Sequence, residues 1–570
     1  MSASNMSESE RPVEMSRVPT ILFWLCAAFM LFFGLGGREL WTAEDRWAEV
    51  SRWMILTGDF FHPCINGQPY FDKPLLGYWA IVFTTHLTGG LNEWAIRIPS
   101  AVAGMLALWA TISLGRKLWD DETARLSGWL LLTCEGFIFW ARTGQADMAS
   151  LAAIMLAVNW YWGRRDRPGF MNSLVFYVIC LLGAQFKGLA AVAVPCIAVA
   201  PDLLREKRWR FLFTLRHLSA FVLALAVYFA PFIIEARTRG GYSSSGLALV
   251  FRENVQRYFN PFDHKGAFYI YLYNLPALFA PWALIFVLGV VACVPHLKRL
   301  WGPSRWLVTA AILVFLFFTA SGSRRSYYIL PLVPFCALFT ARWLTSKVPS
   351  TLKVWALRIT ASVIILLAVL EILCPLIWPL LKKSAGVSLP ADFLPSCFAI
   401  GTLAIAVWVL HRYRSSMTMR LIGLVSPVAV LLLMAFVLIC GFFCRQQLSM
   451  EVFRNIKAFS ANARDKAKSP DHVAFYGTNR AAIAFYMNYA KPIRILADPV
   501  KTADFLQNDP GRNLLIISHA DYDQLQKVIP SDMKCEVVVK EEGISPAEIK
   551  KRKDMLVIAL LSGEEKPMSH

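Results

Sequence analysis

Long apolar segments separated by short polar ones make up most of this 570-residue chain. A membrane-spanning helix needs about 20 apolar residues, and fewer where it ends inside a protein core. By this criterion the pattern predicts thirteen spans, near residues 19–36, 97–115, 126–141, 146–162, 171–184, 188–202, 217–233, 270–293, 306–320, 326–343, 354–373, 393–411 and 420–443. We therefore expect an α-helical polytopic membrane protein.

The composition and charge of the chain agree with this expectation. Hydrophobic residues make up 56% of the chain and charged residues only 17%, which is too apolar for an ordinary soluble protein. A net charge of +19 would suggest nucleic-acid binding in a soluble protein, but the basic residues here cluster between the apolar segments. Such clusters report membrane topology, so the bilayer is an expected partner and nucleic acid is not.

Six basic clusters predict the orientation of the spans, because short basic loops belong in the cytoplasm. They lie at 116–125, 164–167, 205–216, 298–305, 342–353 and 412–420. The second and third clusters can share one side only if the chain crosses the membrane twice between them. Residues 171–202 are therefore predicted to be a hairpin of two helices. The N-terminal segment 1–18 is then cytoplasmic, and the loop 38–96 is external.

After the membrane domain, residues 19–443, the composition becomes that of a soluble domain. In residues 444–570, apolar runs of strand length at 473–476, 493–496, 514–518, 535–539 and 556–560 alternate with helix-like stretches. This alternation predicts a small external α/β domain. It contains no glycine-rich phosphate loop, so we expect no nucleotide cofactor.

The loop 38–96 is dense in acids, arginines and aromatics. Thr42 precedes Glu44, Asp45 and an amphipathic run that is predicted to form a helix lying flat on the membrane. The two acids have two interpretations. They favour a helix N-terminus, where Thr42 and Asp45 fit a capping box, or one of them faces a cavity as a general base.

Further ionisable residues lie on the external side. Asp72 and Lys73 either anchor the loop at the interface or serve a site in which Lys73 meets a phosphate. Lys187 interrupts an apolar stretch, which is a functional signal unless its amine only reaches the membrane surface. Asp147 begins a predicted helix and either caps it or acts as an acid.

Two more external features follow along the chain. Arg324 and Arg325 lie where the positive-inside rule disfavours them, and guanidinium groups there suit an anionic lipid or a phosphodiester. His264 is a lone histidine in a loop, for which a structural role is the commoner reading. Ionisable groups concentrated at one membrane face indicate an active site at that surface.

Several motifs combine into a family pattern. They are Glu44–Glu49, Thr57–Asp59, Pro69–Leu75, Arg97–Pro99, Arg142 with Asp147, Phe186–Gly188, His264 and Ser326–Pro331. Together they resemble the GT-C membrane glycosyltransferases, in particular the bacterial aminoarabinose transferases and the protein mannosyltransferase-like group. One position departs from the pattern, since Ala43 stands where the family has an aspartate. Either Glu44 or Asp45 could then supply the carboxylate.

The resemblance implies a GT-C fold and transfer of a sugar from a polyprenyl-phosphate donor to a lipid, polysaccharide or protein acceptor. Lipid A modification with aminoarabinose at the periplasmic face of a bacterial inner membrane is one such reaction. The implied roles are catalysis by Glu44, Asp45 and Asp147, donor-phosphate binding by Lys73, Arg97, Lys187, Arg324 and Tyr328, and support from Asp72, Arg142 and His264. A divalent metal near Asp72 and His264 occurs in the family, and two candidate ligands leave metal binding open.

Two other classes of membrane protein compete with this interpretation. A flippase for lipid-linked sugars would use the same cationic pocket without a carboxylate base. A channel would need polar residues through several spans, whereas the polar residues here collect at one face. Sugar, acceptor and polyprenol length are not specified by the residues alone.

Overall fold

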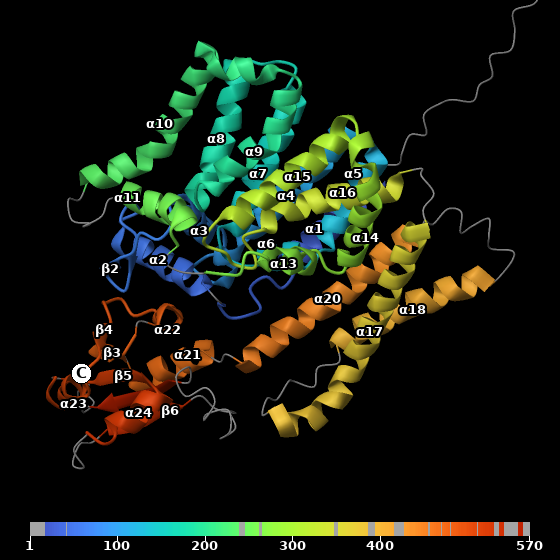
Figure 1. The fold of residues 1–570 in the computed structure, drawn as a ribbon. Coiled ribbons are helices and arrows are strands. Elements are labelled where there is room, and N and C mark those ends of the chain that lie inside the picture. Colours follow the sequence, from blue (N-terminus) through green and yellow to red (C-terminus); the bar gives the residue numbers. More distant parts are fainter. Residues whose placement is uncertain are drawn as a thin grey trace, which may run out of the picture.

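The computed structural model describes residues 18–41, 43–238, 246–261, 265–346, 351–385, 394–414, 427–453, 456–468, 470–478, 480–509, 511–528, 535–540 and 557–562. A large helical part is followed by a smaller part that carries a sheet (Figure 1). The helical part contains α1 (Val18–Phe32), α4 (Glu93–Leu118), α5 (Asp121–Leu132), α6 (Glu135–Ala141), α7 (Asp147–Arg164), α8 (Phe170–Phe186), α9 (Ala190–Arg205), η1 (Arg208–Phe213), α10 (Leu215–Thr238), α11 (Gly246–Phe251), η2 (Arg252–Gln256), α12 (Arg257–Phe259), α13 (Ile270–Leu278), α14 (Ala283–Cys293), η3 (Val294–Arg299), α15 (Gly302–Ala320), η4 (Leu330–Leu332), α16 (Val333–Thr345), α17 (Thr351–Ala385), α18 (Leu394–Arg414) and α20 (Pro427–Phe453).

Helix α4 lies at the centre of the helical part, packed against α5 and α7. Small residues make the close packing against α5 possible, since a Cβ added at Gly115 would lie 2.9 Å from the Cα of Ala124. The helices α8, α9 and α10 lie to one side of this centre, and α17, α18 and α20 lie to another (Figure 1). One apolar core includes residues from α1 to α20, and a second core joins the first loop to α8 and α10.

The hairpin predicted over residues 171–202 is confirmed, because α8 ends at Phe186 and α9 begins at Ala190. Two other predicted spans are each broken into two helices. Residues 126–141 divide between α5 and α6, and residues 270–293 divide between α13 and α14. Pro281 lies at the second break, where it has no amide hydrogen to donate to a continuing helix.

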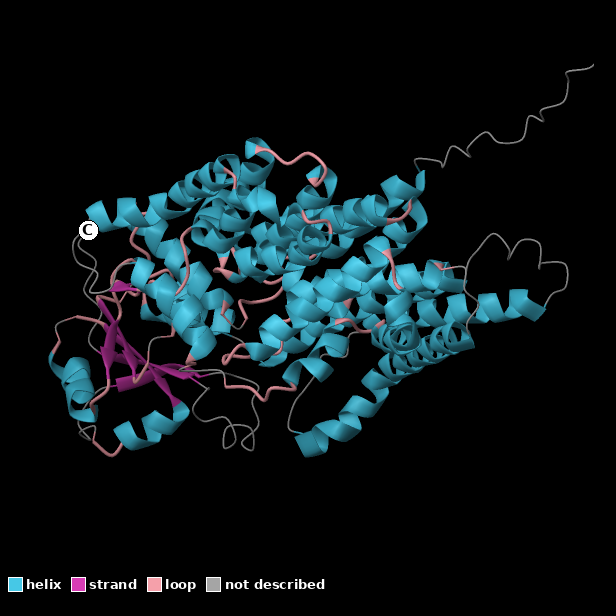
Figure 2. Ribbon diagram, turned by 45° about the horizontal axis from the view of Figure 1, so that its top comes forward, coloured by secondary structure: helices cyan, strands magenta, loops and turns pink. Residues whose placement is uncertain are grey.

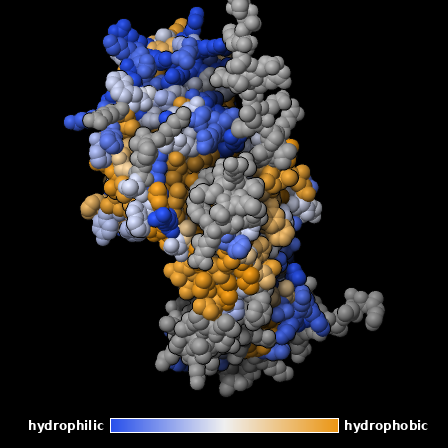
Figure 3. Space-filling model, turned by 90° about the vertical axis from the view of Figure 1, so that its right-hand side faces the viewer, coloured by the Kyte–Doolittle hydropathy of each residue, from blue (hydrophilic) through white to orange (hydrophobic). Residues whose placement is uncertain are grey.

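Four helices are long and apolar enough to cross a membrane, namely Glu93–Leu118, Leu215–Thr238, Gly302–Ala320 and Thr351–Pro375, and six shorter apolar helices accompany them in the described parts of the chain. In the last of the four, only 17% of the most apolar window is buried by protein. The face drawn in Figure 3 is hydrophobic over much of its middle, with hydrophilic side chains gathered at the top. Such a surface fits contact with lipid, and the number of thirteen spans stays a prediction.

The first loop contains α2 (Glu44–Thr57), a short hairpin of β1 (Cys64–Ile65) with β2 (Gln68–Pro69), and α3 (Leu76–Leu87). The predicted helix after Thr42 is therefore confirmed, but its N-cap residue is Ala43, without a side-chain cap, and Thr42 lies outside the described residues. For α2, a position flat on the membrane stays a prediction. The helix is buried over most of its length, packing against both α3 and α22 (Ala481–Met487).

The C-terminal part has a five-stranded sheet in the order β4-β3-β5-β7-β6. β3 (His472–Tyr476) pairs in parallel with β4 (Arg494–Leu496) and β5 (Asn513–Ser518), whereas β7 (Val557–Ser562) runs antiparallel to β5 and to β6 (Cys535–Lys540). The accompanying helices are α21 (Ile456–Ala467), α22, α23 (Pro499–Asn508) and α24 (His519–Leu525). Each of the five predicted strand runs coincides with one of these strands (Figure 2).

This sheet domain is attached to the first loop by polar contacts. The Asn66 side-chain nitrogen donates to the Ile493 carbonyl oxygen at 2.7 Å, and the Ile493 amide donates back to the Asn66 side-chain oxygen at 2.6 Å. Arg52 donates to the Tyr489 carbonyl at 2.8 Å while Glu49 holds its guanidinium from the other side at 2.8 Å. The first loop thus lies between the helical part and the sheet.

Candidate active site

A cavity of about 610 Å³ collects charged side chains from four separate segments of the chain. Its walls include the first loop, the start of α7, the turn between α8 and α9, and the segment from η2 to α12. The ionisable lining residues are Lys73, Asp147, Lys187, Glu253 and Arg257, and the aromatic lining residues are Tyr258, Phe259, Phe317, Phe318, Tyr327 and Tyr328. Sequence reasoning predicted Lys73, Asp147, Lys187 and Tyr328 for one site, and the structure brings these four together.

Asp147 and Lys187 form an ion pair at this cavity. Asp147 is the first residue of α7, but the helix has no side-chain cap at Ala146, so the carboxylate is directed to the lysine and not to capping. The Lys187 ammonium also lies 5.4 Å from the ring centroid of Tyr327 and 5.1 Å from that of Tyr328. Cation–π contacts of this kind stabilise a partly desolvated charge.

The turn that carries Lys187 is fixed by the next residue and by η2. Gly188 has φ +149, a conformation that side chains disfavour, and a Cβ there would lie 2.3 Å from the side-chain oxygen of Asn254. That same oxygen accepts a hydrogen bond from the Leu189 amide at 2.7 Å. The turn and η2 are therefore locked together behind the cavity.

A chain of polar contacts leads from the first loop to the cavity. Arg46 donates to the Tyr70 hydroxyl at 2.9 Å, and this hydroxyl donates to the Asp72 carboxylate at 3.2 Å. The Lys73 ammonium is 3.0 Å from the Asp72 carboxylate and 3.9 Å from that of Glu253. Asp72 thus holds Lys73 in place at the cavity wall, where the ammonium is shared between two acids.

Glu253 was not singled out from the sequence. One carboxylate oxygen lies 2.5 Å from Arg257, and the other lies 3.9 Å from Arg252. Burial raises the pKa of this carboxyl, and the nearby charges of Lys73 and Arg257 lower it by less, so the pKa stays above its usual value. Glu253 stands on η2 and Arg257 begins α12. η2 is a π-helix, a form often found at functional sites.

A sequence signal for this segment did exist. Arg252 and Arg257 lie in a loop predicted to be external, where the positive-inside rule disfavours arginine. The same reasoning was applied to Arg324 but not to them. An acid and an arginine four residues apart on a helix also look like an ordinary surface pair. The sequence pattern therefore does not distinguish Glu253 and Arg257 from surface residues.

Glu44 occupies a different environment from Asp147. Its side chain is fully buried, and Arg97 donates to both of its oxygens at 2.9 Å. The Gly144 amide donates at 2.6 Å and the Trp41 amide at 2.9 Å. Burial alone would raise the pKa of this carboxyl, but the charges of Arg38 and Arg97 and the hydrogen bonds lower it to about 2.

These contacts make Glu44 a poor general base, because a buried carboxylate with so low a pKa does not take up a proton near neutral pH. The structure favours a positioning role instead. Through Gly144, Glu44 holds the loop that leads into Asp147. Asp45, the alternative in the first loop, is half-buried, its carboxylate accepts from the Arg46 amide at 2.8 Å, and it does not line the cavity.

The three arginines predicted near the site form their hydrogen bonds with groups outside the cavity. Arg97 is buried against Glu44 and is not available to a donor phosphate. Arg142 donates to the carbonyls of Met30 and Phe33 at the end of α1, at 2.7 and 2.8 Å. Arg324 donates to the Thr319 and Gly266 carbonyls at 2.9 Å each. We therefore place none of the three in the cavity, since backbone carbonyls or Glu44 already take their hydrogen bonds.

His264 lies outside the described residues, so its predicted supporting role has no structural description. Among the residues that the structure describes, no group of three or more histidine, cysteine or acidic side chains is arranged to hold a metal ion. Asp72 faces Lys73 and Tyr70 in the described contacts. Whether the protein uses a metal stays an open prediction.

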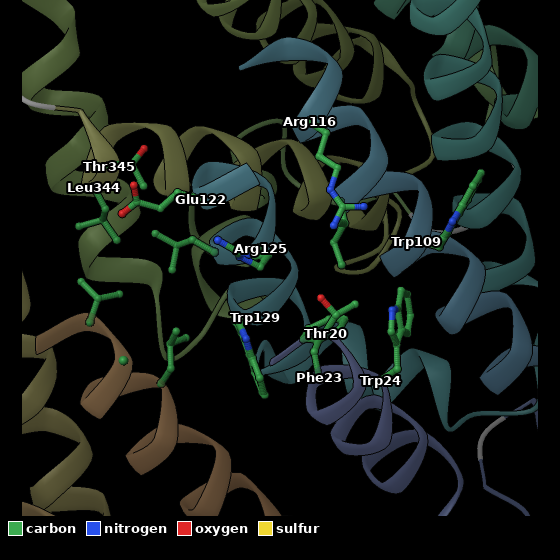
Figure 4. A pocket seen from close by; sticks show the side chains of 15 residues that line it. Thr20, Phe23, Trp24, Trp109, Arg116, Glu122, Arg125, Trp129, Leu344 and Thr345 are labelled. Atoms are coloured by element: carbon green, nitrogen blue, oxygen red, sulfur yellow. The ribbon is translucent and has the colours of Figure 1, made fainter. Parts of the chain in front are cut away.

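A second cavity, of about 440 Å³, is lined by the C-terminal half of α4 together with α1, α5, α16 and α20 (Figure 4). Arg97 and the second cavity's Arg116 are separated by about 28 Å of helix, at 1.5 Å per residue. The lining of the second cavity is mainly aromatic and aliphatic, and it includes Trp24, Trp109 and Trp129. Arg116 is turned to Asp121 at 2.6 Å. Tryptophans and arginines at helix ends are typical of a membrane interface, so we assign the chemistry to the first cavity.

Comparison with known proteins gives this arrangement a context. A family model described as dolichyl-phosphate-mannose-protein mannosyltransferase matches residues 72–234. The crystal structure of ArnT from Cupriavidus metallidurans bound to undecaprenyl phosphate superposes with a TM-score of 0.74, at 18% identity, over 96% of this chain and 100% of that one. The apo form of that ArnT gives a TM-score of 0.69. The chain has the GT-C fold.

Sequence relatives agree with the GT-C fold. An undecaprenyl phosphate-alpha-4-amino-4-deoxy-L-arabinose arabinosyl transferase from Enterobacter sp. (strain 638) is 29% identical over 397 residues, which is 66% of this chain and 68% of that protein. Its counterpart from Pseudomonas aeruginosa (strain UCBPP-PA14) is 28% identical over 335 residues, or 55% of this chain and 58% of that protein. The resemblance predicted from the motifs is confirmed.

Proposed function

We propose that the protein is a glycosyltransferase that moves 4-amino-4-deoxy-L-arabinose from undecaprenyl phosphate to lipid A. The observation that carries this proposal is the joining of Lys73, Arg257 and the Asp147–Lys187 pair in one cavity of a GT-C fold. Relatives named for this transfer supply the donor.

The cations of the cavity suit a lipid phosphate. Lys73 and Arg257 approach the same space from the first loop and from α12, and Lys187 faces it from the turn after α8. A guanidinium and an ammonium that converge on one anion form short, charge-assisted hydrogen bonds. Tyr328, which lies beside Lys187, adds a hydroxyl on the same wall.

Asp147 is the acid best placed to act on the acceptor. It lines the cavity, whereas Glu44 has no exposed surface. In the proposed step, Asp147 takes the proton of the acceptor oxygen as that oxygen bonds to the anomeric carbon. The bond from this carbon to the phosphate oxygen breaks, and the electron pair leaves with the polyprenyl phosphate. Lys73, Arg257 and Lys187 stabilise the charge that develops on the leaving phosphate.

The predicted topology supports a periplasmic position for the reaction. The cavity lies among the loops opposite the six basic clusters, which belong in the cytoplasm under the positive-inside rule. The multi-pass arrangement fits a bacterial inner membrane protein, as in the related transferases. An undecaprenyl-linked donor would present its phosphate at the same level.

The proposal is tested with the purified protein in nanodiscs, lipid A as acceptor, and a panel of undecaprenyl-phosphate-linked sugars that includes aminoarabinose and mannose. We expect mass spectrometry to show lipid A gaining one aminoarabinose, with mannose transferred poorly. Preferred transfer of mannose to a protein acceptor would favour the mannosyltransferase-like alternative. Movement of the donor across the bilayer without any transfer would favour a flippase.

A further inference from the structure

Glu253 is an acid within a cavity whose cations suit an anion. Its carboxylate lies 2.5 Å from Arg257 and 3.9 Å from Lys73, which are two of the three cations that we assign to the donor phosphate. The side chain is only 13% exposed. In the structure, then, the proposed phosphate site is filled by a carboxylate that belongs to the protein itself.

A carboxylate and a phosphate cannot both take these contacts. Each accepts charge-assisted hydrogen bonds from the same donors at similar lengths. If a phosphate bridged Lys73 and Arg257 while Glu253 stayed in place, two anions would lie within a few ångströms of each other in a partly buried site, where repulsion is poorly screened. One of them has to move.

Glu253 is the group that is able to move. It stands on η2, a π-helical segment between two α-helices and of a form that is frequent at functional sites, and its long side chain can rotate without a change in the backbone. The next residue, Asn254, is tied to the Leu189 amide at 2.7 Å. The backbone is thus held at one point, so a rotation of the Glu253 side chain does not displace the turn that carries Lys187.

We propose that Glu253 is a positioning residue that substitutes for the donor phosphate. In the empty protein it holds Arg257 and Lys73 in their binding positions, and it yields these contacts when the phosphate arrives. This proposal rests on the proposed function, since it takes the anion to be a polyprenyl phosphate. It also gives a route for product release, because transfer leaves a monoester phosphate that the returning carboxylate displaces.

The charged groups around Glu253 set what a substitution should do. Arg252 and Arg257 face it from its own segment, Lys73 and Asp72 from the first loop, and the Asp147–Lys187 pair lines the same cavity. Replacing Glu253 with glutamine keeps the shape and removes the competing charge. The cations remain, so an incoming phosphate should bind more tightly.

The experiment measures binding of undecaprenyl phosphate to the full-length protein in nanodiscs. We expect Glu253→Gln to bind it about 10- to 100-fold more tightly than the wild type, as expected when a nearby like charge is removed. In the transfer assay, both KM for the donor and kcat should fall, because product leaves slowly. Asp121→Asn is the control, since it removes an acid that pairs with an arginine outside the first cavity, Arg116, and should leave binding unchanged.

Unchanged or weaker binding by Glu253→Gln, with a normal wild type, would overturn this inference and leave the proposed function intact. A wild type that neither binds undecaprenyl phosphate nor transfers sugar would instead overturn the proposed function. If Glu253→Gln melts far below the wild type, Glu253→Asp replaces it in the test. The shorter acid retreats from Arg257 and should tighten binding by a smaller factor, and binding equal to or weaker than the wild type would contradict the proposal.

Discussion

Two buried acids, Glu44 and Asp147, show how environment separates residues that look alike in the sequence. Glu44 is enclosed by Arg97, Arg38 and two backbone amides, which lower its pKa to about 2. Asp147 forms an ion pair with Lys187 and faces the cavity. The first acid stabilises the loop that the second one stands on, and only the second one can meet an acceptor.

Substitution of Glu44 should therefore lower the stability of the protein, whereas substitution of Asp147 should lower the transfer rate. Glu44→Gln leaves Arg97 buried without its charge partner, so the protein should lose about 3 to 5 kcal/mol of stability. Asp147→Asn should fold and still bind undecaprenyl phosphate, but lose about 10² to 10⁴-fold in transfer rate. Thermal unfolding in detergent and the transfer assay separate the two effects. A stable Glu44→Gln protein with the same loss of turnover would return the role of base to Glu44.

Sequence reasoning found the cavity residues that interrupt apolar stretches. Lys187 stands out because a membrane protein rarely keeps a lysine within an apolar stretch without a use, whereas the catalytic role of Asp147 was predicted from the family resemblance. It could not place the arginines, because a charge in a sequence does not reveal which carbonyl or carboxylate takes its hydrogen bonds. Arg324, which caps the end of α15, illustrates this.

At the scale of elements, the basic clusters predicted where helices end better than the lengths of the apolar segments did. Two basic clusters sufficed to predict the α8–α9 hairpin. Length alone suggested continuous spans over residues 126–141 and 270–293, where the structure has breaks. Breaks of this kind depend on single residues such as Pro281 and on packing between distant helices, and neither is visible as a change in hydropathy.

The turn between α8 and α9 gives a prediction at the same scale. Gly188→Ala should displace Asn254 or the turn, because the new Cβ would lie 2.3 Å from the side-chain oxygen of Asn254. We expect donor binding to weaken at least about tenfold, since Lys187 moves with the turn. Gly89→Ala is the control, because Gly89 has φ +69 with open space around it. Equal effects of the two substitutions on donor binding would show that backbone strain alone is responsible.

At the scale of the whole molecule, the first loop connects the membrane part to the sheet domain. It supplies Lys73 to the cavity on one side and Asn66 and Arg52 to the sheet domain on the other. The composition change after residue 443 predicted a second folded part with its strands. It carried no information on docking, because Asn66 and Arg52 bond to backbone groups of Ile493 and Tyr489, which have no sequence signature.

The presence of two cavities with different linings makes the central claim directly testable. A cryo-EM structure of the protein in nanodiscs with undecaprenyl phosphate would show where the lipid phosphate binds. The account predicts phosphate density between Lys73 and Arg257, within hydrogen-bond distance of both, with the Glu253 side chain turned away. Phosphate density beside Arg116 in the second cavity, with the first cavity empty and Glu253 still on Arg257, would contradict it.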